Sequence, residues 1–141
     1  MTFKKDNVVL GIMVAGYADR PFCYGESQML KNILEGQLLY KNDVSRQKFM
    51  LFEELFQTED VLSIRDGIAD VLAKKAVKYD FHNEYETLSI CVESAGEAYQ
   101  ATIHLQYADK NVTESFEQSR DELNDIMAYL TKCSEEFPVR F

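Results

Sequence analysis

Two acidic clusters carry the residue types in this chain that could bind a metal ion. Glu93 and Glu97 are four residues apart, and Glu122 and Asp125 are three apart. If both segments are helical, each spacing places its two carboxylates on one face. Carboxylates that converge repel one another unless a cation offsets their charge, and Mg²⁺ prefers oxygen ligands of this kind. The clusters therefore form a candidate Mg²⁺ site, with two solvated helix faces as the alternative interpretation.

The apolar residues around both clusters favour helices. They recur mostly at three- and four-residue steps, which is the period of a helix with one buried stripe. The carboxylates would then lie at the margin of that stripe, where they must be paired or metal-bound. The stripe residues are Leu88, Cys91, Val92, Ala95, Tyr99 and Ile103 around the first cluster, and Ile126, Met127, Tyr129 and Leu130 after the second.

The two clusters together resemble a known family. The run Glu93-Ser-Ala-Gly-Glu97-Ala-Tyr-Gln-Ala101, followed by Asp121-Glu-Leu-Asn-Asp125-Ile-Met, resembles the MazG-like all-α nucleoside triphosphate pyrophosphohydrolases. Members of that family carry an E-E-x-x-E cluster on one helix and an E-x-x-D cluster on the next, and the two hold Mg²⁺ against a triphosphate. The resemblance covers roughly residues 60–133 and departs from the family pattern at Ser94, where the family has its second glutamate.

The resemblance implies a reaction, a cofactor and an assembly. The reaction is hydrolysis between the α- and β-phosphates of a nucleoside triphosphate substrate. Glu97, Glu122 and Asp125 would hold Mg²⁺, which lowers the pKa of an attacking water. Glu93 would complete the metal shell or accept the proton of that water as the catalytic residue. Members usually form dimers or tetramers, so a homo-oligomer is expected. Candidate phosphate contacts are Lys74, Lys75, Lys78, Lys110 and Arg120.

The first interpretation of the fold is all-α, a bundle of about five helices. Val8 to Tyr17 is apolar and could be a buried strand or a short helix. A loop follows from Asp19 to Gly25. The remaining segments are expected to be helical: Ser27 to Tyr40 with Ser27 as N-cap, Val44 to Gln57, Asp60 to about Tyr79, and the segments through the two acidic clusters, the last capped by Thr113 or Ser115.

A second interpretation is α+β with a hairpin at residues 87–107. Thr87 to Glu93 and Tyr99 to Tyr107 alternate apolar and polar residues, and Ser94-Ala-Gly-Glu could be the turn between two strands. The N-terminal apolar run would then be a further strand. In that case Glu93 and Glu97 belong to a hairpin, and the argument for a metal site fails.

A second acidic set occurs earlier in the chain. Glu53 and Glu54 precede a predicted turn, and Asp66 and Asp70 follow it on one helical face. An antiparallel helix pair would bring them together. However, Gln57 and Gly67 stand where further acidic ligands would be expected, so this site ranks second.

Composition favours a single soluble domain over residues 1–141. The chain has 141 residues, 46% of them hydrophobic, which suits one core. Its formal charge of −9 argues against nucleic-acid and anionic membrane partners, because both require clustered cations. Cys23, Cys91 and Cys133 lack the spacing of a disulfide framework or a zinc site, which favours a reduced, cytoplasmic location.

A competing function is a non-catalytic binding module. Inhibitors, immunity proteins and chaperones are small acidic proteins of this kind, and the partner would be a basic protein. The chain has eight Tyr and nine Phe, residue types that anchor protein interfaces. The sequence therefore supports either a Mg²⁺-dependent pyrophosphohydrolase or an acidic protein-binding module.

Overall fold

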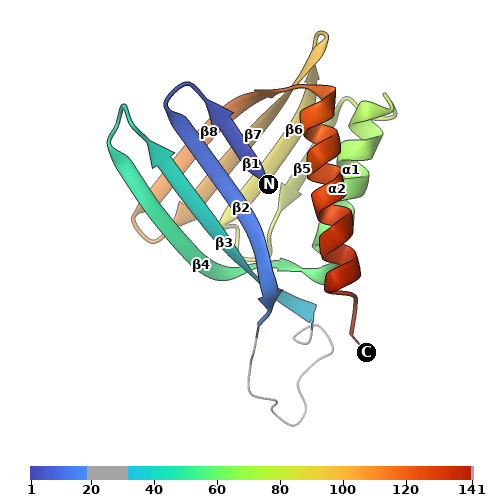
Figure 1. The fold of residues 1–141 in the computed structure, drawn as a ribbon, viewed down its shortest axis with the longest axis horizontal. Coiled ribbons are helices and arrows are strands. Elements are labelled where there is room, and N and C mark those ends of the chain that lie inside the picture. The colour runs from blue at the N-terminus through green and yellow to red at the C-terminus, as the bar shows by residue number, and fades with distance from the viewer. Residues whose placement is uncertain (19–31, 141) are drawn as a thin grey trace.

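The computed structural model describes residues 1–18 and 32–140 and consists of two four-stranded antiparallel sheets with two helices (Figure 1). Each half of the chain contributes four strands followed by a helix. The first half gives β1 (Thr2–Lys5), β2 (Val8–Tyr17), β3 (Ile33–Asn42), β4 (Gln47–Gln57) and α1 (Thr58–Leu72). The second gives β5 (Lys78–His82), β6 (Leu88–Ala95), β7 (Ala98–Tyr107), β8 (Lys110–Gln118) and α2 (Arg120–Glu136). In each sheet the strand order follows the chain.

The strands follow from a two-residue period of buried side chains. In β2, Leu10, Ile12 and Val14 are buried, and the residues between them are not. In β7, Ile103 and Leu105 continue the same alternation. Successive side chains of a strand point to opposite faces, so each sheet has an inner face in the core and an outer face.

The core lies between the inner faces of the two sheets and against the helices. The strands of the first sheet cross in front of those of the second (Figure 1). Ring contacts join the sheets: Phe3 and Phe116 have centroids 5.5 Å apart, and Phe56 and Phe81 are 6.0 Å apart. The helices α1 and α2 pack side by side, and Leu123 and Leu130 of α2 are among the side chains they bury. Both halves therefore share one core.

Gly67 of α1 packs directly against the Tyr79 ring of β5. A Cβ atom at Gly67 would lie 2.2 Å from Cδ2 of Tyr79, so only glycine fits there. Tyr79 is held in turn, because its hydroxyl lies 2.9 Å from the Ser63 hydroxyl. Gly67, which interrupts the second acidic set in the sequence, has a packing role in the structure.

The predicted all-α bundle is wrong. Residues 33–42 and 47–57, expected to be helical, form β3 and β4. The predicted helix through Glu93 and Glu97 is instead the β6–β7 hairpin, in which Ile90 lies opposite Ile103. The helical period was misleading because Cys91 is only partly buried and Ala95 is exposed, whereas Leu88, Ile90 and Val92 alternate.

The two remaining helix predictions agree with the structure in part. The predicted helix from Asp60 overlaps α1, which ends at Leu72 instead of near Tyr79. The last helix is capped by Ser119, not by Thr113 or Ser115. The predicted loop at 19–25, the Ser27 cap and Cys23 lie outside the described residues. Within the described ranges, no helix has both the length and the apolar character needed to cross a bilayer.

Candidate functional site

The structure places the first predicted acidic pair on the β6–β7 hairpin. Glu93 lies in β6 opposite Lys78 and Gln100. Glu97 is exposed in the turn between β6 and β7. A four-residue spacing places two residues on one face of a helix or of a continuous strand, and the turn that separates Glu97 from β6 removes that relation.

The second predicted pair lies in the first turns of α2. Glu122 is part of a capping box: its Oε1 accepts a hydrogen bond from the backbone N–H of Ser119 at 3.1 Å, and its own N–H donates to Ser119 Oγ at 3.1 Å. Asp125 lines an open groove with Lys4 and Tyr129. Glu122 therefore has a local structural role at the start of the helix.

The four predicted metal ligands do not form one group. No set of three or more His, Cys, Asp or Glu side chains is placed to hold a metal ion within residues 1–18 and 32–140. The second acidic set is also dispersed, because Glu53 accepts a hydrogen bond from Tyr107 and Asp66 pairs with Arg65 at 3.0 Å. The geometry that a shared Mg²⁺ would need is absent from the described part of the chain.

The outer face of the second sheet, here called the polar face, carries side chains that satisfy one another. His82 Nδ1 lies 2.9 Å from Ser89 Oγ, and the hydroxyls of Thr102 and Ser115 lie 2.9 Å apart. His104 Nδ1 makes a similar contact with a neighbouring threonine at 2.6 Å. These are cross-strand pairs, and such pairs stabilise a sheet without an added partner.

The one described cysteine on the polar face, Cys91, is not poised for chemistry. Burial and a hydrogen bond with Asp80 raise the pKa of its thiol to about 11. The thiol therefore stays protonated at neutral pH, and a protonated thiol is a weak nucleophile.

The outer face of the first sheet, here called the apolar face, exposes large hydrophobic side chains. Met13, Leu39, Met50 and Phe52 are exposed over 47%, 37%, 59% and 56% of their surface. They make up half of the eight large hydrophobic residues that are exposed in the described chain. An exposed apolar cluster of this kind on a soluble protein commonly marks a binding surface.

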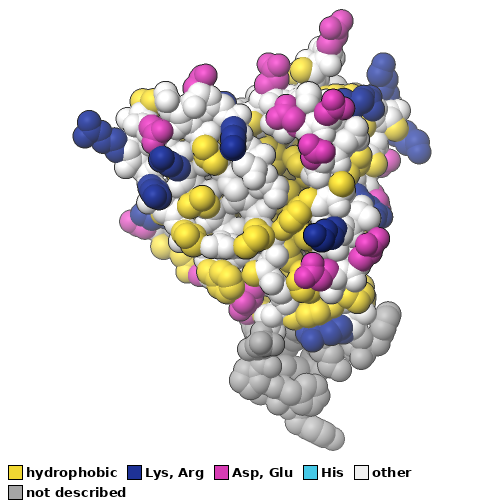
Figure 2. Space-filling model, viewed as in Figure 1, with side chains coloured by type: hydrophobic (Ala, Val, Ile, Leu, Met, Phe, Trp, Pro, Cys, Tyr) yellow, Lys and Arg dark blue, Asp and Glu magenta, His cyan; other side chains and the backbone are white. Residues whose placement is uncertain are grey.

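The strand register makes these side chains neighbours. Gly11, Leu39 and Met50 form one row across β2, β3 and β4, and Met13, Gln37 and Phe52 form the next. The row through Gly11 is hollow, because a Cβ atom there would meet nothing within 4 Å. An open groove of about 450 Å³ runs along this part of the face. Figure 2 shows hydrophobic atoms over this sheet and along its border with α2.

Opposite charges flank the apolar rows. Lys4, Lys41 and Lys48 share a row with Val9 at one end of the face. At the other end Glu35 lies opposite Glu54. The apolar face therefore runs from cationic through apolar to anionic along the strand direction, although the chain as a whole carries a net charge of −9.

A tyrosine of α2 fixes the border of the apolar face. Strand β1 pairs only with the first part of β2, and beyond it the backbone N–H of Val14 donates to the Tyr129 hydroxyl at 2.8 Å. Burial raises the pKa of Tyr129 to about 12, so its hydroxyl stays neutral. The groove wall is therefore built from α2 as well as from the sheet.

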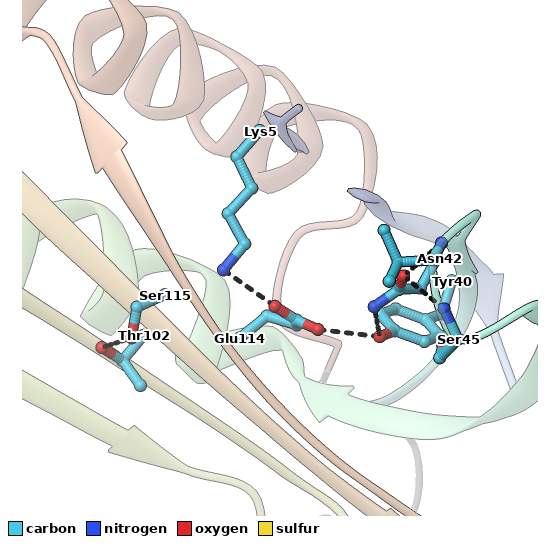
Figure 3. Close-up of polar contacts among 8 residues, drawn as sticks. Lys5, Tyr40, Asn42, Ser45, Thr102, Glu114 and Ser115 are labelled. Carbon is cyan, nitrogen blue, oxygen red and sulfur yellow. Dashed lines mark hydrogen bonds and ion pairs between the residues drawn. The ribbon is translucent and has the colours of Figure 1, made fainter. Parts of the chain in front are cut away.

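A carboxylate network joins the two sheets at their inner faces (Figure 3). Glu114 of β8 lies 2.9 Å from Lys5 Nζ and accepts a hydrogen bond of 2.8 Å from the Tyr40 hydroxyl, which in turn accepts from Asn42 Nδ2 at 3.1 Å. Burial acts to raise the pKa of Glu114, but the hydrogen bonds from Lys5 and Tyr40 outweigh it and the pKa is lowered. Glu114 therefore has a structural role, because its carboxylate binds Lys5 and Tyr40 of the other sheet.

Sequence reasoning placed Leu39, Met50 and Phe52 in expected helices and left the segment that contains Met13 open between a strand and a helix. One signal could have found them: in β4, residues at odd positions such as Phe49 and Leu51 alternate with Met50 and Phe52, so both faces of the strand are apolar. A strand of that kind is either covered on both faces or leaves one of them open to a partner.

Comparisons with known proteins bear on the fold alone. No protein-family model matches the sequence, and no curated protein matches it. The resemblance to MazG-like pyrophosphohydrolases is wrong, because that family is all-α and this chain is built mainly from two sheets. The structure is similar to that of the plant transcriptional regulator PBF-2, with a TM-score of 0.57 and 12% identity over 97% of this chain and 80% of that one. The two proteins therefore share a fold.

Proposed function

We propose that this protein is a non-catalytic binding module that holds an extended segment of a protein partner on the apolar face. The observation that carries the proposal is the contiguity of Met13, Leu39, Met50 and Phe52 on adjacent rows of one sheet. Fully burying a side chain of this class is worth roughly 1.5–3 kcal/mol, so covering several of them provides a substantial driving force. Part of that gain offsets the cost of association.

The charges at the two ends of the apolar face define the partner segment. An acidic residue suits the row of Lys41 and Lys48, apolar residues suit the middle, and a basic residue suits the end at Glu35. A nucleic acid suits the face less well, because its phosphates would meet Glu35 and a chain of net charge −9. The fold shared with a transcriptional regulator supports a binding role and does not identify the partner.

Selection from a displayed library of random peptides tests the proposal. We expect enriched sequences in which an acidic residue, apolar residues and a basic residue follow in order. Leu39→Asp should weaken the selected peptide by about 100-fold, which corresponds to about 3 kcal/mol, because it places a charge in the middle of the apolar rows. Fluorescence polarisation measures the affinity.

The control is Gln106→Asp, which introduces the same carboxylate at an exposed outer position of β7, a central strand of the other sheet. It should leave the affinity unchanged, and circular dichroism should show both variants folded. The proposal is contradicted if no peptide is enriched, or if Gln106→Asp weakens binding as much as Leu39→Asp. Binding of a single-stranded oligonucleotide that depends on Lys41 and survives Leu39→Asp would replace the protein partner with a nucleic acid.

A further inference from the structure

We infer that β4 is the dimerisation edge of this protein: two copies pair their β4 strands antiparallel about a two-fold axis at Leu51, which joins the two first sheets into one eight-stranded sheet. The inference goes beyond the proposed function, because it concerns pairing along the free edge of β4, although the outward-facing side chains of that strand also lie on the apolar face. It requires no peptide ligand.

The outer edge of β4 is long and open. Strand β4 is last in its sheet and has 11 residues, and no strand of the described chain pairs with its far side. None of residues 47–54 is buried, and even the inward-facing Phe49 and Leu51 are only partly covered. In β3, by contrast, the inward-facing Leu38 and Tyr40 are fully buried. A long edge of this kind offers unpaired backbone groups to another strand.

The other sheet edges differ from β4. Strands β1 and β5 have only four and five residues. Strand β8, at the edge of the second sheet, contacts β1. The regular part of β4 ends at Leu55, where the pairing with β3 shifts between Leu34 and Glu35. The regular stretch available for pairing is therefore centred near Leu51.

The outward-facing residues of β4 are complementary to themselves. In chain order they are Lys48, Met50, Phe52 and Glu54. Reversing the strand about Leu51 places Lys48 opposite Glu54 of the second copy, and Met50 opposite Phe52 of the second copy. Two-fold symmetry repeats each pair, which gives two ion pairs and two apolar contacts.

Neighbouring registers do not match. A two-fold axis normal to the sheet keeps every side chain on its own face, so it must pass through a residue. An axis at Phe52 places Met50 opposite Glu54 of the second copy, and Lys48 opposite Phe56. An axis at Met50 places Lys48 opposite Phe52 of the second copy. Of these three axes, only the one at Leu51 places apolar side chains opposite apolar ones and a basic side chain opposite an acidic one.

The inward-facing side of the same register has an apolar contact at its centre and a mixed pair on either side. Phe49 comes to lie opposite Glu53 of the second copy. Lys110 Nζ lies 5.4 Å from the centroid of the Phe49 ring, so a cation is already beside that position. Leu51 meets Leu51 of the second copy at the axis, where both are partly buried before pairing. The pairing therefore covers apolar surface that one copy leaves half open.

Charge reversal tests the pairing. Lys48→Glu and Glu54→Lys should each weaken the dimer by about 10-fold or more, because each places like charges opposite one another twice. Mixing the two single variants should restore a dimer, now formed only between unlike copies, because each facing pair of positions 48 and 54 then carries one acidic and one basic side chain. Light scattering after size-exclusion chromatography gives the mass, and differently tagged chains show the mixed pairing.

A cross-linking test fixes the axis. Leu51→Cys places two thiols opposite each other at a separation that a disulfide can bridge in an antiparallel pair. The control Lys48→Cys places its two thiols about 20 Å apart, since six residues of strand separate them. We expect oxidative cross-linking of the first variant and not of the second.

Each outcome decides the inference. A wild-type protein that stays monomeric at high concentration, single variants that dimerise as well as the wild type, or equal cross-linking at positions 48 and 51 would overturn it. Leu39→Asp, which is expected to weaken peptide binding, should leave the dimer intact, so failure of the dimer and failure of the proposed function are separate results.

Discussion

The two halves of this chain repeat the same order of four strands and a helix, but their outer faces differ in character. The outer face of the first sheet exposes side chains such as Met50 and Phe52. The outer face of the second sheet carries hydroxyls and imidazoles in hydrogen-bonded pairs, for example His104 with Thr113. The inner faces of both sheets, in contrast, are mainly apolar and contribute to the same buried core.

This difference separates what the topology requires from what it leaves open. Both sheets must bury one face, so their inner residues are constrained alike. An outer face whose polar groups satisfy one another is stable in water, whereas an outer face of uncovered hydrophobic side chains gains from a partner. The contrast between the polar face and the apolar face is therefore the main evidence for where this protein binds.

The largest expected effect tests whether the two halves form one folding unit. Gly67→Ala should lower the free energy of unfolding by about 3 kcal/mol, because the new methyl group would overlap the Tyr79 ring of the other half. Urea denaturation measures the loss. Asp70→Ala, at an exposed position of the same helix, should change stability by less than about 0.5 kcal/mol. A tolerated Gly67→Ala would mean that α1 does not hold the halves together.

The next effect concerns the carboxylate between the two sheets. Glu114→Gln should lower the free energy of unfolding by about 1–2 kcal/mol at neutral pH, because it removes charged hydrogen bonds to Lys5 and Tyr40. The pKa of Glu114 is lowered on folding, so its contribution is complete above the ordinary carboxyl pKa of 4.5 and is lost as the pH falls from there through the folded value. Wild type and variant should therefore converge in acid, as thermal melts across that range can show.

A smaller effect compares the starts of the two helices. In α2 the hydroxyl of Ser119 accepts from the backbone of Glu122, so Ser119→Ala should cost about 1 kcal/mol. In α1 the N-cap is Gln57, and the main bond runs from its backbone N–H to the Asp60 carboxylate at 2.7 Å. Gln57→Ala keeps that bond and should cost less. Equal losses in urea denaturation would show that the two caps contribute alike.

The smallest expected effect on stability sharpens the contrast between the two faces. Met50→Thr replaces an exposed side chain with a good strand former, so it should change the free energy of unfolding by less than about 0.5 kcal/mol. It should nevertheless weaken the selected peptide. Thr102→Val on the polar face removes the partner of Ser115 and should do the reverse, with a small loss of stability and unchanged peptide affinity. If Met50→Thr and Thr102→Val changed peptide affinity by the same amount, the two faces would not differ in binding.

Part of the fold could be predicted from the sequence. The α+β alternative for residues 87–107 follows from two-residue alternation, and that alternation is present in β6 and β7. The N-terminal apolar run left strand and helix open, and it forms β2. The last helix is predicted from its apolar spacing, although its capping box at Ser119 and Glu122 was missed. Local pattern was sufficient where one face of an element is buried and the other is polar.

The apolar face could not be predicted in the same way. In β4, Phe49, Met50, Leu51 and Phe52 are consecutive, and a run of this kind fits a buried helix as well as a strand with two apolar faces. The predicted metal ligands are not brought together for a related reason, because the helix expected to align Glu93 and Glu97 is a strand followed by a turn. In both cases the secondary structure is decided by which strand, distant in the sequence, pairs with the segment.

Backbone chemical-shift mapping with a selected peptide decides which face of this protein binds. Titration of the peptide into isotope-labelled protein should shift the amide resonances of β2, β3 and β4 around Gly11, Leu39 and Phe52. The resonances of β6, β7 and β8 on the polar face should not move. Shifts confined to the polar face, with the apolar face unaffected, would contradict the proposed binding surface.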